Sequence, residues 1–148
     1  VKELNEKLSE NCWRSSSLNW GSDVKQGING SCIITPVSDI INPLLEKELK
    51  PSLPECRKLE FNYYIWQPQS GISWHNDKGP GRLFGASLYL NDEWHPNMGG
   101  WFIWEDEKGH HTILPKKKFL VLNNNYEHHC VTPVSTGFRC TIQIWGFL

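Results

Sequence analysis

The spacing of hydrophobic positions changes once along the chain and divides it into two zones. In the first zone, Val1–Glu10 can form a short helix, because Leu4 and Leu8 lie one helical turn apart. The stretch Gly21–Pro36 is rich in Gly, Ser and Asn, which predicts a loop with at most a short strand. Residues 1–57 are therefore expected to form a helical and irregular lead-in.

A more regular helix is predicted near the end of this lead-in. Ser38 or Asn42 can cap its N-terminus, and Pro43 suits its first turn. Its apolar face would consist of Leu44, Leu45 and Leu49. Pro51 and Pro54 would then end the helix, because proline has no backbone N–H to continue it.

From residue 58 onward the hydrophobic period becomes two, which is typical of β-strands. Six alternating runs are visible: Leu59–Trp66, Leu83–Leu90, Gly100–Glu105, His111–Leu114, Phe119–Leu122 and Arg139–Phe147. Further strand pieces around Ser73–Asp77 and Glu127–Val131 bring the number to about eight. Many short strands after a helical lead-in predict a mainly β fold, a jelly roll with N-terminal helices packed on one side. We expect one domain spanning 1–148, with its β core at 58–148.

Composition says more about the cellular location and possible partners of the protein than about its function. The 15 Lys and Arg nearly balance the 16 Asp and Glu, so neither a nucleic acid nor an acidic membrane is indicated as a partner. The five cysteines are odd in number and show no Cys-x-x-Cys spacing, which favours reduced thiols and a cytoplasmic location. No apolar run reaches membrane-spanning length, and the oligomeric state is not indicated.

Candidate chemistry begins with a His-x-Asp pair, His75 and Asp77, in a predicted strand. Residues two apart on a strand point to the same face, so this imidazole and carboxylate would converge. A second histidine from a distant strand would complete a 2-His-1-carboxylate set, which leaves coordination positions open and suits Fe(II). The pair alone is weak evidence for a metal site and is more typical of a surface turn, because Asn76 and Lys78–Gly81 are turn-like.

The C-terminal segment supports the metal hypothesis. His129 lies in one predicted strand, a turn with Pro and Gly follows, and Arg139 opens the next strand. Hairpin geometry would bring Arg139 back beside a metal held by His129. A guanidinium suits a carboxylate partner because its fork binds both oxygens, and Thr141 on the same strand face can add a hydroxyl.

Together these motifs resemble the 2-oxoglutarate/Fe(II)-dependent oxygenase superfamily, and most of all its prolyl-4-hydroxylase-like branch. The pattern there is His-x-Asp, a Gly-Gly strand, His-x-Val-x-Pro-Val and Gly-x-Arg. The chain supplies these parts in order as His75 and Asp77, Gly99 and Gly100, His129 with Val131, Pro133 and Val134, and Gly137 with Arg139. The resemblance covers about residues 59–148 and implies a double-stranded β-helix with iron near its open end.

The resemblance also implies a reaction and a set of catalytic residues. His75, Asp77 and His129 would hold Fe(II), and Arg139 would bind the co-substrate 2-oxoglutarate, with ascorbate as a candidate stimulant. The enzyme would be a dioxygenase that hydroxylates a C–H bond while 2-oxoglutarate is decarboxylated to succinate and CO₂. Because Asp77 keeps the carboxylate ligand, hydroxylation is favoured over halogenation. The substrate would be a peptide, with peptidyl proline implied only by the resemblance, or a small molecule.

The chain departs from the family pattern at two points. Trp66 stands where a tyrosine often precedes the His-x-Asp strand, and Tyr64 could bind 2-oxoglutarate from the same strand face instead. Some members of the branch use lysine where this chain has Arg139. Two adjacent histidines compete for the distal ligand position, and the ten-residue spacing to Arg139 favours His129 over His128.

Other functions remain open at this stage. A nucleic-acid dealkylating oxygenase is one, a cupin-like metal-binding jelly roll without oxygenase activity is another, and a metal-free module that binds sugar or peptide is a third. The loops Lys78–Arg82 and Asp92–Met98 are expected to shape access to the site. Trp74, Trp101 and Trp104 lie near the motifs and either fill the core or line a pocket.

Overall fold

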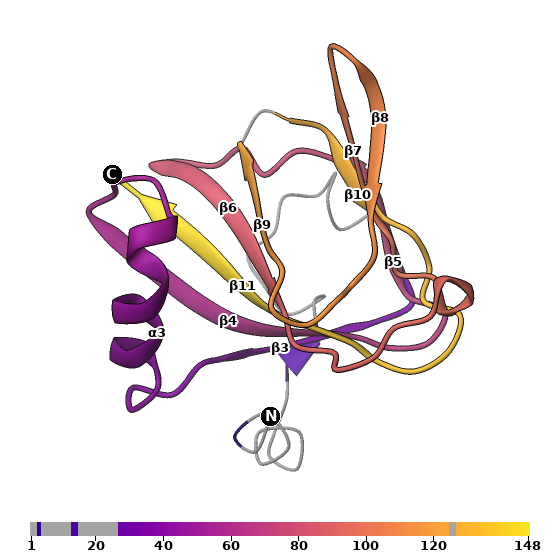
Figure 1. The fold of residues 1–148 in the computed structure, drawn as a ribbon, viewed down its shortest axis with the longest axis horizontal. Helices are drawn as coiled ribbons and strands as arrows, with labels where there is room; N and C mark the ends of the chain where they lie inside the picture. Colours follow the sequence, from indigo (N-terminus) through magenta and orange to yellow (C-terminus); the bar gives the residue numbers. More distant parts are fainter. Residues whose placement is uncertain (1–2, 4–12, 15–26, 125–126) are drawn as a thin grey trace.

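The structure is a computed structural model, and it describes residues 3, 13–14, 27–124 and 127–148. Within these residues, a six-stranded and a five-stranded antiparallel sheet face each other (Figure 1). The major sheet has the strand order β1-β3-β4-β11-β6-β9, and the minor sheet has the order β2-β5-β10-β7-β8. The prediction of a mainly β jelly roll is therefore confirmed.

The elements have the following bounds. The major sheet contains β1 (Trp13–Arg14), β3 (Cys32–Pro36), β4 (Lys58–Trp66), β6 (Arg82–Tyr89), β9 (Leu120–Asn124) and β11 (Arg139–Phe147). The minor sheet contains β2 (Ile28–Asn29), β5 (Gly71–His75), β7 (Phe102–Asp106), β8 (Gly109–Ile113) and β10 (His129–Val131). The helices are α3 (Asn42–Leu49) and the 3₁₀ turns η2 (Lys50–Ser52) and η3 (Pro96–Met98).

The eight predicted strands correspond to β4–β11, with ends that differ by a few residues. The described part of the lead-in adds β1, β2 and β3. The segment that contains β3 was expected to be loop with at most a short strand, but the five-residue β3 runs antiparallel beside β4 as a full member of the major sheet. Its β-branched run Ile33–Thr35 favours the extended conformation, and Cys32 and Ile34 are buried between the sheets.

Side-chain alternation along β4 and β11 produces two hydrophobic cores. One face packs toward α3 and buries Phe61, Tyr63, Ile65, Ile142 and Ile144. The opposite face looks into the space between the sheets, where Tyr64 and Trp66 pack with residues of β5, β7 and β10. Because strand residues alternate, β11 can present apolar side chains to the helix and polar ones to the interior of the sandwich.

Helix α3 covers the outer face of the major sheet, as the prediction of helices on one side requires (Figure 1). Leu45 and Leu49 pack against the sheet, whereas Leu44 is 58% exposed, so the apolar face is narrower than expected. The predicted side-chain cap is wrong, because the N-cap residue is Ile41 and no side chain caps the helix. Ser38 contributes through its backbone carbonyl instead, which accepts from the amides of Ile41 and Asn42.

The predicted helix Val1–Glu10 lies outside the described residues except for Glu3, which is helical. The Glu3 carboxylate accepts hydrogen bonds from the Ser38 amide at 3.0 Å and from the Tyr63 hydroxyl at 2.7 Å. These two bonds tie the start of the chain to the helix-covered side of the major sheet. Among the described helices, none is long and apolar enough to cross a membrane.

Candidate functional site

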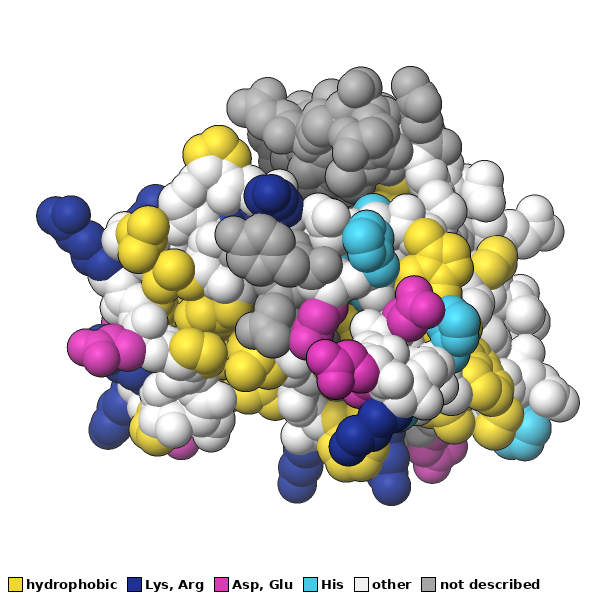
Figure 2. Space-filling view, turned by 90° about the horizontal axis from the view of Figure 1, so that it is seen from above, with side chains coloured by type: hydrophobic (Ala, Val, Ile, Leu, Met, Phe, Trp, Pro, Cys, Tyr) yellow, Lys and Arg dark blue, Asp and Glu magenta, His cyan; other side chains and the backbone are white. Residues whose placement is uncertain are grey.

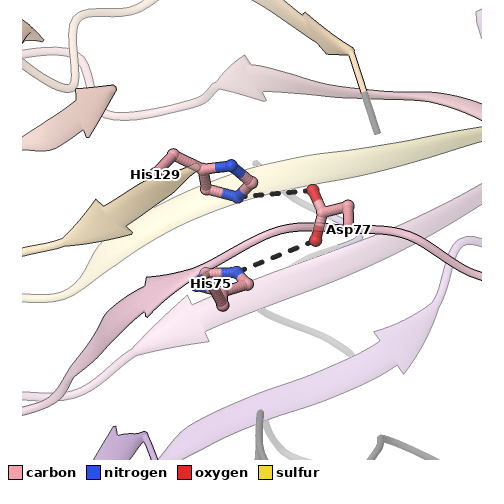
Figure 3. A group of neighbouring side chains, drawn as sticks. All are labelled: His75, Asp77 and His129. Atoms are coloured by element: carbon pink, nitrogen blue, oxygen red, sulfur yellow. Dashed lines mark ion pairs between the residues drawn. The ribbon is translucent and has the colours of Figure 1, made fainter. Parts of the chain in front are cut away.

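Three side chains that can bind a metal converge between the sheets (Figure 3). His75 ends β5, and His129 opens β10 opposite it in the antiparallel register, so their ring centroids lie 4.4 Å apart. Asp77 reaches both rings: its Oδ1 is 3.7 Å from His75 Nε2, and its Oδ2 is 3.4 Å from His129 Nε2. One nitrogen from each ring and one carboxylate oxygen therefore face a common point.

Asp77 arrives by a different route from the one predicted. The strand ends at His75, and Asp77 lies in the loop that follows, so strand alternation does not explain the convergence. The turn-forming residues outweigh the strand pattern here, because the Asn76 side chain accepts a hydrogen bond from the Lys78 amide at 3.2 Å. The Arg82 guanidinium also donates to the backbone carbonyl of Asp77 at 2.8 Å and holds the loop against β6.

Backbone carbonyls determine which nitrogen of each histidine is available. His75 Nδ1 lies 2.8 Å from the Ser73 carbonyl, and His129 Nδ1 lies 3.0 Å from the Glu127 carbonyl. A carbonyl oxygen can only accept, so each Nδ1 carries the proton and donates it. Each Nε2 then keeps a lone pair for a metal ion, which is the usual arrangement around a ligating imidazole.

The electrostatics of His75 and Asp77 favour the protonation states that a metal needs. Burial and the neighbouring His129 lower the pKa of His75 below its ordinary value of 6.5. Burial pushes the pKa of Asp77 upward, but the hydrogen bond and charge of His129, together with His75 and Asn123, bring it below the ordinary value. A neutral imidazole and an ionised carboxylate are thus the favoured states near neutral pH. Two imidazoles and one carboxylate with open positions form a donor set that fits Fe(II).

The three groups open into a cavity of about 340 Å³ between the two sheets. Its walls combine the metal-binding groups with the interior face of β11 and with apolar residues of both sheets, namely Trp66, Ile72, Phe102 and Val131. Arg139, Thr141, Gln143 and Trp145 all line the cavity, as their shared strand face predicts.

Arg139 is the most unusual residue of this cavity. It is only 2% exposed, yet no carboxylate pairs with it among the described residues. Its Nη2 donates to the Tyr89 hydroxyl at 3.3 Å, its guanidinium lies over the Tyr89 ring, and its Nε is buried without a hydrogen-bond partner. A buried guanidinium with an unused donor fits a ligand that carries a carboxylate, because burying a charge without a partner is costly.

Arg139 and His129 do not form the predicted hairpin. β10 belongs to the minor sheet and β11 to the major sheet, so the turn between them crosses from one sheet to the other. The crossing places the histidine and the arginine on opposite walls of one cavity. A Pro/Gly turn can end either a hairpin or a sheet-to-sheet connection, and the turn composition alone does not distinguish them.

Several residues of the site escape the sequence motifs. Tyr89 supplies the hydroxyl beside Arg139, and Asn123 donates to Asp77 Oδ2 at 2.9 Å. Ser87 also lines the cavity, where its hydroxyl donates to the predicted face residue Gln143 at 2.7 Å. The pairing of β6 with β11 brings these residues to the site, because Tyr89 lies opposite Thr141 and Ser87 lies opposite Gln143.

Tyr64, proposed from the sequence as a co-substrate contact, lines the cavity and is buried. Burial raises the pKa of its hydroxyl, while a hydrogen bond with the Trp145 side chain opposes that shift. Its hydroxyl therefore already has a protein partner at the Trp145 end of β11. A contact between Tyr64 and 2-oxoglutarate stays a prediction.

The remaining histidines lie outside the cavity. His128 and His95 are exposed, and His129 rather than His128 faces Asp77, as the spacing to Arg139 predicts. His110 and His111 sit on the β7–β8 hairpin, where His111 binds Asp106 and stacks on Trp104.

The expected surroundings of the cavity are only partly correct. Trp74, Trp101 and Trp104 are not among its lining residues. Of the two access loops, Lys78–Arg82 contributes to the wall, whereas Asp92–Met98 does not. Figure 2 shows histidine and acidic side chains near one another on the face seen from above, with Lys and Arg scattered rather than gathered into a stripe.

Of the comparisons with known proteins, the family model identifies the family, and the solved structures share the fold. A family model described as the 2OG-Fe(II) oxygenase superfamily matches residues 59–147. A Pseudomonas putida prolyl-4-hydroxylase structure is similar, with 19% identity, a TM-score of 0.69, and coverage of 83% of this chain and 78% of that one. No curated protein gives a match.

Two further structures are similar in fold. One is a prolyl hydroxylase from Trichoplax adhaerens in complex with a hypoxia inducible factor peptide, with 17% identity, a TM-score of 0.75, and coverage of 97% and 74% of the two chains. The other is a 2OG-Fe(II) oxygenase family oxidoreductase from Burkholderia pseudomallei, with 13% identity, a TM-score of 0.71, and coverage of 99% and 76%. At these identities the structural likeness concerns the fold.

Proposed function

Because this chain belongs to the 2OG-Fe(II) oxygenase superfamily, we propose that it hydroxylates a C–H bond of its substrate while 2-oxoglutarate is oxidised to succinate and CO₂. The observation that carries the proposal is that one cavity contains both the His75, Asp77 and His129 cluster and the buried Arg139. The first can hold a metal, and the second can bind a dicarboxylic acid.

The proposed metal ligands are His75 Nε2, His129 Nε2 and a carboxylate oxygen of Asp77. The carbonyls of Ser73 and Glu127 hold the imidazoles in the required tautomer and orientation. Fe(II) in such a site supplies the oxidation, in which one oxygen atom of O₂ enters succinate and the other enters the substrate.

Arg139 is proposed to bind the distal carboxylate of 2-oxoglutarate. Arg139 and Thr141 both line the cavity, so the guanidinium N–H groups and the hydroxyl can donate to that carboxylate. The apolar lining, which includes Ile72 and Phe102, limits the water around the bound acid. In a site of low polarity, the charge pair between acid and guanidinium is stronger than it would be in water.

The substrate is proposed to be a peptide or a small molecule that reaches the cavity past the Lys78–Arg82 loop. The Trichoplax adhaerens structure contains a bound peptide, which favours a peptide for this chain by similarity alone. Stimulation by ascorbate and a cytoplasmic location stay predictions. The four described cysteines are free.

Two alternatives are weaker. A cupin-like metal protein without oxygenase activity would have no use for a buried guanidinium in the same cavity as the metal-binding groups. A nucleic-acid dealkylating enzyme is expected to carry a basic stripe, and the face in Figure 2 has scattered Lys and Arg instead.

Binding and turnover test the proposal in sequence. Fe(II) and 2-oxoglutarate added together under anaerobic conditions are expected to give a weak visible absorption band that neither gives alone. On admission of O₂, succinate should form, and mass spectrometry of candidate peptides should show the gain of one oxygen atom. A protein that binds neither metal nor 2-oxoglutarate at saturating concentrations would refute the oxygenase proposal.

A further inference from the structure

The carboxylate of Asp77 lies in a notch of the major sheet, opposite the sheet that carries the two histidines. Gly85 of β6 stands in register between Asn123 of β9 and Trp145 of β11. A Cβ atom at Gly85 would come within 2.7 Å of the Trp145 ring and 3.2 Å of Asp77 Oδ2. The missing side chain of Gly85 therefore leaves room first for the Trp145 ring and also for the carboxylate beside it.

Asn123 forms one wall of this notch and holds the carboxylate by a direct bond. Its side chain is 5% exposed, and its Nδ2 donates to Asp77 Oδ2 at 2.9 Å. Asp77 itself comes from the loop after β5, where no strand ladder fixes its backbone. The bond thus connects the loop carrying one proposed metal ligand to the far sheet.

The carboxylate of a loop residue needs such a restraining hydrogen bond for a physical reason. An unrestrained aspartate samples several rotamers, and ordering it when a ligand binds costs free energy. A buried amide that donates to one oxygen removes much of that freedom in advance and satisfies the charge. Arg82 restrains the backbone of the same residue through the Asp77 carbonyl.

We propose that Asn123 is a positioning residue that, with the notch at Gly85, presents the Asp77 carboxylate to the metal. This inference rests on the proposed metal site at His75, Asp77 and His129. Asn123 acts through Asp77, because its amide nitrogen donates to Oδ2 of that carboxylate. Removal of a residue that holds a metal ligand typically weakens metal binding by about 10- to 100-fold.

The test compares metal affinity in three single variants. Asn123→Leu keeps the size of the side chain and removes the donor, and Gly85→Ala crowds the Trp145 ring and Asp77 Oδ2 while Asn123 keeps its amide. Both should weaken Mn(II) binding by about 10- to 100-fold in a direct titration. Val121→Ala is the matched control, because Val121 shares the strand and the face of Asn123 and packs in the interior core without lining the cavity.

Three readouts separate positioning from packing. Val121→Ala should lower the unfolding temperature and leave the Mn(II) dissociation constant within about twofold of wild type, since only packing is lost. The visible spectrum of the Co(II)-loaded protein should change for Asn123→Leu and not for Val121→Ala. At saturating metal, the Michaelis constant for 2-oxoglutarate should change by less than about threefold in the Asn123 variant, because Arg139 is untouched.

The outcomes distinguish this inference from the proposed function. If the wild type binds Mn(II) and the folded Asn123→Leu and Gly85→Ala variants bind it equally well, the positioning inference is wrong and the metal site stands. Losses of affinity that follow unfolding temperature alike in all three variants would also overturn it. If the wild type binds no metal, the proposed function fails and this inference with it. Asn123→Ala repeats the comparison if the leucine variant does not fold.

Discussion

Replacement of Arg139 should affect co-substrate binding and the stability of the empty protein in opposite directions. The guanidinium is 2% exposed and has no carboxylate partner among the described residues, so in the unliganded protein it is a buried charge with little compensation. A bound 2-oxoglutarate would supply the missing partner. The Arg139 side chain is therefore expected to destabilise the unliganded protein and to contribute strongly to the binding of 2-oxoglutarate.

The expected size of the binding effect follows from this burial. Loss of one partner of a desolvated, charge-assisted pair costs about 2–5 kcal/mol, or about 30- to several-thousand-fold in affinity. A surface pair would cost about 1 kcal/mol or less. We therefore expect Arg139→Gln to raise the Michaelis constant for 2-oxoglutarate by at least about 30-fold at saturating Fe(II). The Michaelis constant of Arg139→Lys should lie between those of the wild type and Arg139→Gln, since an ammonium keeps the charge but lacks the forked geometry of the guanidinium.

The effect on stability is tested with Arg139→Met, which removes the charge and retains most of the side-chain volume. Replacing buried charges with apolar groups of similar size is commonly neutral or stabilising by about 1–4 kcal/mol. The unliganded variant should unfold in denaturant at an equal or higher midpoint than the wild type. A Michaelis constant within about threefold of wild type for Arg139→Gln would place the guanidinium outside the co-substrate site. A loss of more than about 3 kcal/mol in unliganded Arg139→Met would refute the reasoning about its uncompensated charge.

Three further predictions follow from the same geometry. His129→Ala should abolish Fe(II) binding while His128→Ala retains it, and a titration that finds loss only in the His128 variant would reverse the assignment. The pKa of His75 is lower in the folded protein than its ordinary value of 6.5, so the unfolded chain binds the proton more tightly. The stability of the metal-free protein should therefore fall as the pH drops below about 6.5. A profile of Tm against pH without that fall would contradict the lowered pKa. Tyr89→Phe should raise the Michaelis constant for 2-oxoglutarate by up to about tenfold, and Tyr64→Phe should change it less; equal effects in succinate assays would mean that both hydroxyls contact the co-substrate.

The sequence predicts the second half of the chain well, because that half follows simple rules. Strands β4–β11 alternate regularly, and the interior face of β11 appears in its polar positions, with Arg139, Thr141 and Gln143 two residues apart. The same alternation predicts that only one of His128 and His129 can face the site, and the spacing to Arg139 selects His129. These features depend on local geometry, which is repeated along a strand and is therefore visible in one sequence.

The sequence is less informative where distant segments decide the outcome. The Asp77 carboxylate reaches the histidines through a turn, and its fixture on Asn123 depends on the pairing of β6 with β9. Nothing in the neighbourhood of Asn123 in the sequence marks it as part of a site. Gly85 likewise resembles any glycine inside a strand, and only the packed structure shows what its missing side chain makes room for.

The cavity also has a mechanical consequence, because its two halves come from different sheets. The histidine pair belongs to the minor sheet, and Arg139 and Thr141 belong to the major sheet. A metal ion and a dicarboxylate bound together would connect the two sheets and stabilise the sandwich against separation of its sheets. Loading should therefore slow hydrogen exchange in β10 and β11 alike, although no peptide bond or hydrogen bond of either strand is altered. In a cell, the supply of iron and of the organic acid would then influence how long the protein survives proteolysis as well as how fast it works.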